Sequence, residues 1–441
     1  MKESKLGESG VCDLVDRLSA LPDPVIHHIY SFLETRLMVQ ASIFSTRWKH
    51  LWASSPYLNF ELKRSGKISH KLSKSDKQER DSFVRFVYRI LVLRDASSIL
   101  KFSLDSESLI NVGNISTWLA AALNRNVKEL HLDIATKNQH FEVPSSLFTS
   151  DITVLTLMDK LSGDNIQVPV PMCTAARIKA LRLEYVRLPD GNSDGELVLS
   201  CPVLEDLTLC TCEDSHLKVF TVSAPLLKTL NLSNENFADF YLVDLPDLVS
   251  ADIQIFKYAA GGTTEKEMFD KCLISFFRAI CNVRYLKLSS ENLKVIAGYP
   301  KIFEMLPNLF HNLRDFMLVD ADHVDDIASI SEITNVLKAL TSIQVFVWRR
   351  RKGFKIPKAV NHRGEELPAQ SIFECLEIVK IENSHARVDE LKFLEFILER
   401  AILLKEISIR AISGDEDTIE KFRQKLLALP RTSSNVVMQI S

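Results

Sequence analysis

The sequence predicts an α/β chain: a small N-terminal module of three helices, then a solenoid of repeats with a curved parallel sheet and helices on its convex side. Three observations lead to this prediction. Residues 16–60 carry three short helical patterns, a motif of the form apolar-x-x-Leu-x-Leu recurs from residue 99 onward, and amphipathic stretches separate several of its copies. Alternating apolar residues are typical of a half-buried strand, and amphipathic stretches are typical of a helix. Each copy of the motif therefore predicts one structural repeat that stacks on its neighbours.

Size and composition narrow the class of protein. The chain has 441 residues, which is more than a single hydrophobic core accommodates. Of these residues 46% are apolar and 25% are charged, a composition typical of folded proteins rather than disordered ones. The net charge of −3 gives no reason to expect nucleic acid as a partner. No membrane association is expected either, because no uncharged apolar run is long enough to span a bilayer. The polar N-terminus lacks a secretory signal, so eight reduced cysteines in the cytoplasm or nucleus are expected.

The N-terminal module is expected to begin its first helix with Asp23 as the N-cap and Pro24 in the first turn. Thr35, and Ser45 or Thr46, are expected to cap the next two helices. Apolar residues recur at helical spacing in the first helix (Val25, Ile26, Ile29, Phe32, Leu33) and on one face of the last (Trp48, Leu51, Trp52). Three short helices are too small to bury all of this surface, which predicts a partner. A module packed only against its own chain is the alternative that the pattern leaves open.

This segment resembles the F-box of plant F-box proteins. The resemblance rests on three strings: Asp16-Arg17-Leu18-Ser19-x-Leu21-Pro22-Asp23, Ser31-Phe32-Leu33, and Ser45-Thr46-Arg47-Trp48-x-x-Leu51-Trp52. Two positions depart from the family pattern: Glu34 stands where proline is usual, and Pro24 replaces a common acidic residue. The resemblance implies an F-box over residues 14–60 that binds a Skp adaptor and, through it, cullin and RING subunits. The residues that it implies for the module core and the adaptor contact together are Leu21, Pro22, Ile26, Ile29, Leu33, Val39, Trp48 and Leu51.

Residues 61–98 are expected to form a connector and a helix. Its first part, 63–81, is rich in Lys, Ser, Arg and Asp and has no apolar periodicity, which is more typical of a solvated loop than of a functional basic patch. Helical spacing follows at Phe83, Val84, Val87, Ile90 and Leu91.

The repeat motif predicts a leucine-rich-repeat array over residues 99–360. In the first half its copies recur at intervals of about 20 to 29 residues, the leucine-rich-repeat period, and in the second half the intervals are longer and irregular. Stretches 116–124 and 269–280 are typical of helices on the convex side. An ordinary α/β fold also alternates strands and helices, but it would not repeat Leu-x-Leu so often. The twelve copies are Ile99-Phe102-Leu104, Val127-Leu130-Leu132, Ile152-Leu155-Leu157, Ile178-Leu181-Leu183, Leu204-Leu207-Leu209, Leu227-Leu230-Leu232, Leu248-Ala251-Ile253, Val283-Leu286-Leu288, Leu313-Phe316-Leu318, Ile343-Phe346-Trp348, Leu376-Val379-Ile381 and Leu404-Ile407-Ile409.

The last part of the chain, residues 361–441, is similar to the FBD region that closes many plant F-box/leucine-rich-repeat proteins. The strings that carry the similarity are Leu376-Glu-Ile-Val-Lys-Ile, Phe396-Ile-Leu-Glu-Arg-Ala401 and Leu429-Pro-Arg-Thr-Ser433. The similarity implies final strands and helices that cap the open end of the array, which a solenoid requires.

A group of cysteines with a histidine and an acidic run could each suggest a metal site. Cys201, Cys210, Cys212 and His216 lack the paired spacing of a zinc site, and Cys212 falls on the Asn/Cys position of the repeat, so a buried repeat cysteine is expected. The acidic run 320–326 lacks the glycine and glutamate of a calcium loop, so a solvated loop is expected.

The basic run Arg349-Arg-Arg-Lys352 is expected to be a solvated loop, with a nuclear-localisation patch or an anion-binding patch as alternatives. Gly261-Gly-Thr-Thr264 lacks the spacing of a phosphate loop, and no string is typical of a catalytic nucleophile. Neither a cofactor nor a catalytic role is therefore expected. Basic residues are not spread over many repeats, so the inositol phosphate of some plant hormone receptors is not carried over.

The two resemblances together imply a non-catalytic, substrate-recognition subunit of an SCF-type ubiquitin ligase. Its F-box would bind the Skp adaptor, and its repeats would hold a protein target, whose identity the sequence does not indicate, close to the charged conjugating enzyme. Concave strand positions are where target contacts are expected, because solenoids present extended concave surfaces. The alternative is a non-degradative interaction protein with a weak F-box.

Overall fold

The computed structural model describes residues 21–43, 47–63, 74–136, 139–161, 165–212, 217–233, 239–243, 245–254, 273–298, 304–306, 309–320, 328–351, 373–412, 416–433 and 435–441. The chain divides into two compact units. The first comprises Met1–Ala135 with Ser150–Ile152, and the second comprises Thr136–Thr149 with Thr153–Ser441.

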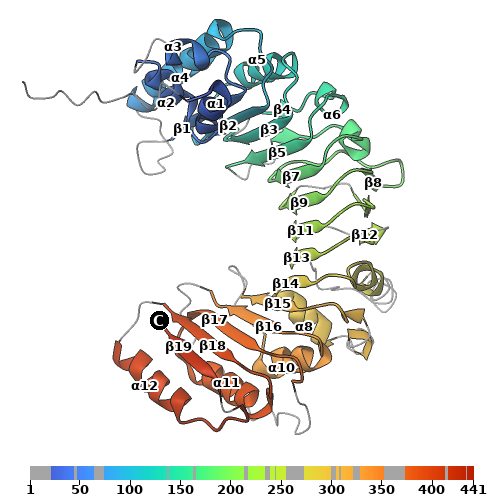
Figure 1. Cartoon of the computed structure of the whole chain (residues 1–441). Helices are drawn as coiled ribbons and strands as arrows, with labels where there is room; N and C mark the ends of the chain where they lie inside the picture. The colour runs from blue at the N-terminus through green and yellow to red at the C-terminus, as the bar shows by residue number, and fades with distance from the viewer. Residues whose placement is uncertain are drawn as a thin grey trace, which may run out of the picture. The chain divides into compact units, whose positions relative to one another are not determined.

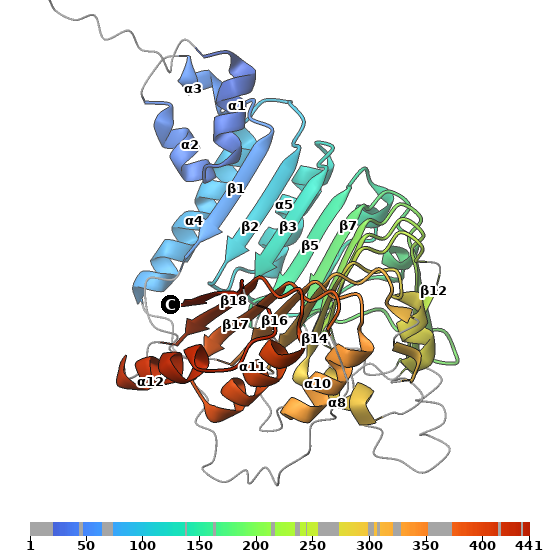
Figure 2. The ribbon, with the colours of Figure 1, turned by 60° about the horizontal axis from the view of Figure 1, so that its bottom comes forward.

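The first unit joins a helical module to three parallel strands (Figure 2). Strands β1, β2 and β3 pair in that order, and helices α4 and α5 pack against each other beside them. The elements are α1 (Asp23–Ser31), α2 (Thr35–Ala41), α3 (Trp48–Leu51), β1 (Tyr57–Leu62), α4 (Lys74–Leu93), β2 (Lys101–Ser106), α5 (Val112–Leu123) and β3 (Glu129–Ile134).

The predicted helix caps of this module are displaced by one residue. Helix α1 begins at Asp23, with Pro22 as its N-cap, and Asp23 pairs instead with the guanidinium of Arg47. Helix α2 has Glu34 as its N-cap. The Thr35 hydroxyl accepts a hydrogen bond of 2.8 Å from the backbone N–H of Asn59 in β1, so it ties the helix to the sheet instead of capping it. The predicted caps Ser45 and Thr46 lie outside the described residues.

The second unit is built on a parallel sheet (Figure 1). Its strands, in spatial order, are β5 (Val154–Asp159), β7 (Ala180–Glu184), β9 (Asp206–Cys210), β11 (Thr229–Ser233), β13 (Ser250–Gln254), β14 (Tyr285–Ser289), β15 (Asp315–Val319), β16 (Val345–Arg349), β17 (Ile378–Ser384), β18 (Glu406–Ala411) and β19 (Val437–Ile440). The helices of this unit are α6 (Ser146–Thr149), η1 (Val170–Thr174), α8 (Ser290–Gly298), α10 (Ile330–Ala339), α11 (Val388–Arg400) and α12 (Glu416–Leu427), with a further helical stretch over 273–279.

The core of both units is made by the predicted motif. Every apolar residue of its twelve copies is buried, including the irregular copies of the second half. Neighbouring copies are register partners: Leu181 pairs with Leu207, and Leu207 with Leu230. Each motif side chain therefore stacks on its counterpart in the next repeat, which is how a repeat that cannot bury its own face becomes stable. The predicted leucine-rich-repeat architecture is confirmed.

The outer layer differs along the second unit. Where the motif intervals are shortest, small parallel sheets replace the expected helices: β12 (Asp239–Val243), β10 (Val219–Ser223) and β8 (Glu196–Ser200) form one, and β4 (Phe141–Glu142) pairs with β6 (Ile166–Gln167). A strand covers about 3.3 Å per residue against 1.5 Å for a helix, so a short connection returns more easily as a strand. Phe240 of β12 packs against Phe276, where the helical part of this layer resumes.

Two strands lie outside the predicted repeats. In β1, Leu58, Phe60 and Leu62 are buried and pair in register with β2, so the sheet starts inside the segment predicted as the F-box. At the other end, β19 pairs with β18. Within the described residues, no helix is both long and apolar enough to cross a membrane.

Candidate functional site

The helical N-terminal module has a core of its own. Ile26, Tyr30 and Met38 are buried together with Trp48 and Leu51, and the rings of Tyr30 and Trp48 meet edge to face at 5.8 Å. Burial raises the pKa of the Tyr30 phenol to about 12. The core is thus filled by the buried face of α1 and by α2 and α3.

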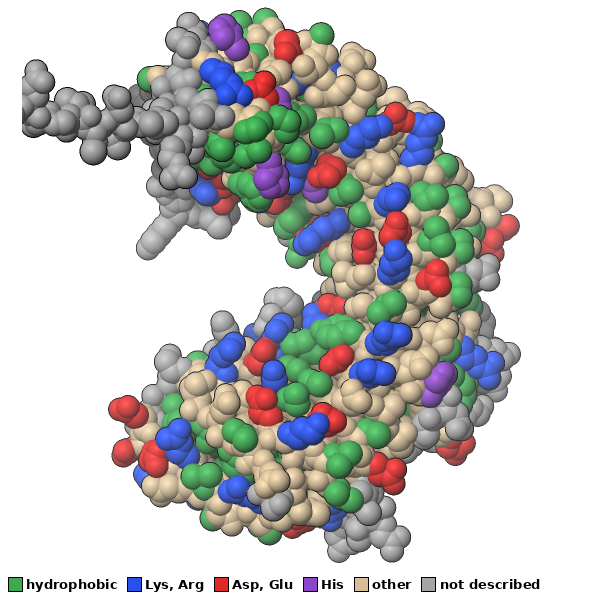
Figure 3. Space-filling model, in the orientation of Figure 1, with side chains coloured by type: hydrophobic (Ala, Val, Ile, Leu, Met, Phe, Trp, Pro, Cys, Tyr) green, Lys and Arg blue, Asp and Glu red, His purple; other side chains and the backbone are tan. Residues whose placement is uncertain are grey.

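A second apolar stripe of α1 faces away from this core. Val25 and Ile29 of α1 and Phe32, its C-cap, follow one another at helical spacing, and the Phe32 side chain is 75% exposed. Leu37 of α2 and Ile43, which follows α2, are also exposed, Ile43 by 84%. Figure 3 shows hydrophobic side chains at the surface of this module. A short helix that is apolar on two faces needs a partner for the second one.

The structure separates the predicted adaptor-contact residues into two groups. Ile26, Trp48 and Leu51 are buried within the chain, so they belong to the module core. Five others keep accessible surface, and they are Leu21, Pro22, Ile29, Leu33 and Val39. Four exposed apolar residues were not among the predicted contacts, namely Val25, Phe32, Leu37 and Ile43. Helical periodicity placed Val25 and Phe32 among the apolar residues of the first helix. It does not indicate which of these residues are buried in the module and which are exposed to solvent.

Glu34, the departure from the F-box pattern, faces the first strand. Burial and a hydrogen bond to Glu61 raise the pKa of its carboxyl group. Glu61 in turn pairs with Lys63 at 2.7 Å. Glu34 therefore interacts with Glu61 of β1, which is itself paired with Lys63 just after that strand.

The sheet of the second unit offers another candidate surface, its open face. We use this name for the face formed by the strand positions that alternate with the buried motif residues. Cross-strand contacts on it include a 3.2 Å hydrogen bond from the Asn231 amide to the Thr208 hydroxyl. They also include an ion pair of 2.6 Å between Lys287 and Asp252.

The acidic and basic runs singled out in the sequence meet at Asp320 and Arg350, which corrects the prediction of a solvated loop at these two residues. Asp320 and Arg350 are buried and paired, and Arg350 also contacts Glu390 at 3.1 Å. Arg349 pairs with Glu382 at 2.6 Å. Arg349 and Arg350 are thus engaged in ion pairs, and the carbonyl oxygen of Arg351 lies 3.0 Å from Nε2 of His385. Lys352 and residues 321–326 lie outside the described residues, so for them the solvated loop stays a prediction.

The predicted repeat cysteine, Cys212, is buried, and its thiol donates toward the carbonyl oxygen of Leu183 at 3.5 Å. His216 and Gly261 to Thr264 lie outside the described residues. Within the described part of the chain, no three His, Cys, Asp or Glu side chains gather as metal ligands.

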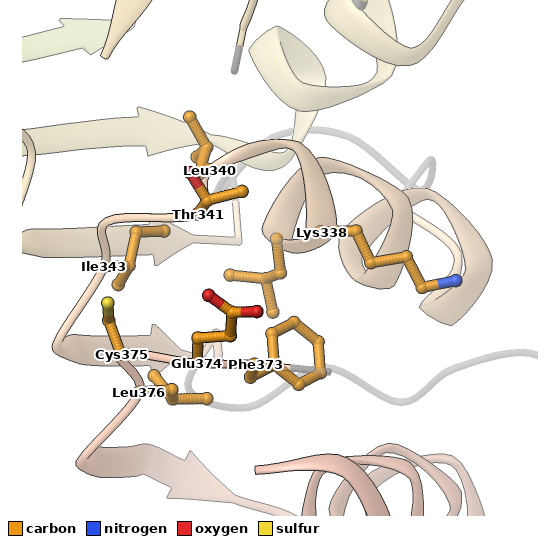
Figure 4. A pocket seen from close by; sticks show the side chains of 9 residues that line it. Lys338, Leu340, Thr341, Ile343, Phe373, Glu374, Cys375 and Leu376 are labelled. Atoms are coloured by element: carbon orange, nitrogen blue, oxygen red, sulfur yellow. The ribbon is translucent and has the colours of Figure 1, made fainter. Parts of the chain in front are cut away.

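A small cavity of about 140 Å³ lies between the C-terminal end of α10 and the segment before β17 (Figure 4). Its lining combines apolar side chains with the Thr341 hydroxyl, the Glu374 carboxylate and the Cys375 thiol. Lys338 extends away from the other labelled side chains, and its ammonium lies 5.1 Å from the centre of the Phe396 ring.

Comparison with known proteins bears on the whole chain. The model of the F-box domain matches residues 18–60, that of the LRR repeats of FBD-associated F-box protein At5g56370 matches 115–263, and that of FBD matches 367–409. The chain belongs to the F-box/FBD/LRR-repeat family. Among its relatives in Arabidopsis thaliana, F-box/FBD/LRR-repeat protein At1g78750 is 27% identical over 95% of each chain. FBD-associated F-box protein At4g13985 is 27% identical over 98% of this chain and 97% of its own. F-box/FBD/LRR-repeat protein At5g56420 is 31% identical over 54% of this chain and 55% of its own.

The three matches fall on structurally distinct parts of this F-box/FBD/LRR chain. The F-box match covers α1 to α3 and enters β1, the LRR match runs from α5 to beyond β13, and the FBD match spans β17 and α11 and enters β18. Members of the F-box/LRR family are typically non-catalytic adaptors, and an F-box generally implies binding to a Skp adaptor.

Proposed function

We propose that this chain is the substrate-recognition subunit of an SCF-type ubiquitin ligase. The exposed stripe of the F-box docks on the Skp adaptor, and the adaptor connects the chain to cullin and RING subunits. The leucine-rich repeats hold a protein target, so that its lysines meet the charged conjugating enzyme at high effective concentration. Ubiquitin transfer itself belongs to the other subunits.

The observation that supports docking is the two-sided apolar character of α1. Its inner stripe, Ile26 and Tyr30, fills the module core, while Val25 and Phe32 of the outer stripe are exposed. Large exposed apolar side chains gathered on one surface are typical of protein interfaces. In this proposal the F-box comprises residues 14–60, the repeats 99–360 and the FBD-like cap 361–441, with 61–98 as the connector.

The test compares two exposed apolar-to-acid substitutions in the full chain. Phe32→Asp places a charge on the stripe without opening the core, and Val388→Asp does the same at an exposed site of α11 in the second unit. Binding to purified Skp adaptor is measured by isothermal titration, and folding by thermal melting. We expect wild type and Val388→Asp to bind equally well and Phe32→Asp to bind more weakly by about a hundredfold, as for a central interface residue.

Two outcomes would overturn the proposal. One is a folded wild-type chain that binds no Skp adaptor, which would favour a non-degradative interaction protein. The other is a Phe32→Asp variant that binds as tightly as wild type, which would place the docking surface elsewhere.

A further inference from the structure

The chemistry of the open face changes between β13 and β14. From β9 to β13 its positions carry short polar side chains and one thiol, such as Thr208, Asn231 and Asp252. From β14 to β17, half of the positions are apolar or aromatic. We call this group the apolar patch, and its members are Tyr285, Met317, Val319, Val345, Val347 and Ile378.

The residues of the apolar patch are neighbours in space. Met317 and Val347 are register partners, as are Val345 and Ile378. The Tyr285 hydroxyl lies 3.3 Å from the sulfur of Met317. Four strands spaced about 4.8 Å apart give the patch a width of about 14 Å. Figure 3 shows hydrophobic side chains gathered in this part of the second unit, with charged side chains of both signs around them.

Some of the charged residues around the patch have an ion-pair partner among the described residues and others do not. Lys287 is paired with Asp252, and Arg349 with Glu382. Lys380, the register partner of Val347, has no ion-pair partner among the described residues. The same holds for Asp315, the register partner of Val345 on the other side.

We infer that the apolar patch is the docking site for an extended segment of the target protein. The segment carries bulky apolar side chains, with an acidic residue that meets Lys380 and a basic residue that meets Asp315. Two strand spacings and one two-residue step separate these positions, so the acid and the base lie about 12 Å apart, or three to four residues of extended chain. This inference rests on the proposed role of the repeats in target recognition.

The patch chemistry suits such a segment. Valine and isoleucine side chains bury apolar groups without directional demands. Met317 is itself buried, so the accessible apolar surface comes from the half-buried residues Tyr285, Val319, Val345, Val347 and Ile378. The unpaired charges select the direction and the sequence of the segment, because a like charge opposite Lys380 or Asp315 would be repelled.

The experiment uses a displayed library of random peptides selected on the immobilised full chain. An enriched peptide is synthesised with a fluorophore, and its affinity is measured for wild type, Val347→Asp, Lys380→Glu and Thr229→Asp. Thr229 lies on the open face of β11, outside the patch, and serves as the matched control. Melting temperatures of all four proteins verify that they are folded.

We expect enriched peptides to carry apolar residues flanked by an acid and a base. Val347→Asp should weaken binding by at least about tenfold, and Thr229→Asp should leave it unchanged. Lys380→Glu should weaken binding similarly, and replacing the peptide's acid by lysine should restore it, because the charges are then reversed on both sides.

Three results would overturn the inference: no enriched peptide, peptides that bind Val347→Asp as tightly as wild type, or self-association of the chain that Val347→Asp abolishes. The last would identify a second copy as the occupant. Skp binding of the same proteins is measured in parallel. If the peptides bind the patch but the wild type binds no adaptor, the ligase proposal fails while the docking site stands.

Discussion

The guanidinium Nε of Arg350 lies 2.8 Å from Oδ2 of Asp320, and both side chains are at most 2% exposed. Arg350 also lies over the ring of Trp348 at 4.4 Å, and the indole N–H of Trp348 donates to the other oxygen of Asp320. Glu390 of α11 is the third partner of this cluster, and it accepts a hydrogen bond from the Ser384 hydroxyl. The cluster therefore joins β15, β16 and β17 to α11, a helix of the FBD match.

Removing Arg350 should destabilise the second unit strongly. Arg350→Ala would leave Asp320 and Glu390 as buried carboxylates without their cation, a loss of about 3–5 kcal/mol. Urea denaturation followed by circular dichroism measures the change. Arg349→Ala is the control, because the Arg349–Glu382 pair is partly exposed and is worth roughly 0–1 kcal/mol. Equal stabilities of the two variants would show that the buried cluster contributes nothing beyond a surface pair.

Tyr30→Phe should stabilise the F-box. The phenol oxygen of Tyr30 is buried and has no hydrogen-bond partner among the described residues. Removing a buried unsatisfied hydroxyl should raise the free energy of unfolding by about 1 kcal/mol or more. Thermal melting of the variant tests this, with Tyr57→Phe at a half-exposed tyrosine as the control. A lower melting temperature for Tyr30→Phe would mean that the hydroxyl has a partner that stabilises it.

The first unit should lose stability as the solution becomes mildly acidic. Burial, and next the charge of Lys101, lower the pKa of His131 below its ordinary value of 6.5. The unfolded chain therefore takes up a proton at a higher pH than the folded chain does. Stability is complete above about pH 6.5 and falls as the pH drops toward the folded pKa. The free energy of unfolding is measured by urea denaturation at several pH values between 8 and 5. It should fall less steeply with decreasing pH for His131→Gln than for wild type. Identical slopes would contradict the prediction.

Two buried thiols should resist alkylation at neutral pH. Burial raises the pKa of Cys173 to about 12 and that of Cys201 to about 11, so both remain protonated and unreactive. Cys281 and Cys375 are only half-buried. Iodoacetamide treatment followed by peptide mass spectrometry should show Cys281 and Cys375 modified before Cys173 and Cys201. Modification of Cys173 at the same rate as Cys375 would mean that the second unit opens around it.

Much of the repeat core could be predicted from the sequence, because strand alternation is a local property. Leu181, Leu207 and Leu230 occupy the same place in successive motifs and are stacked in register. The small sheet of β8, β10 and β12 could not be predicted in this way. The apolar pattern alone does not predict its strands. They form because the connections between these repeats are short and have to span the distance back to the next strand.

The candidate site was predicted only in outline. The F-box strings identified the module, and helical spacing identified the apolar residues of α1, but burial decided that Ile26 faces the core and Phe32 the surface. The apolar patch was not predicted residue by residue, since Val345 and Ile378 become neighbours only through the pairing of β16 with β17.

The sequence by itself determined the family, the order of its regions and the residues of the repeat core. These follow from motifs and periods that lie within a few residues of one another. Only the tertiary structure decided which face of α1 is exposed and that the acidic and basic runs meet at Asp320 and Arg350. Those two residues are separated by a whole repeat and lie side by side because the repeats stack in register, a relationship that no local pattern contains.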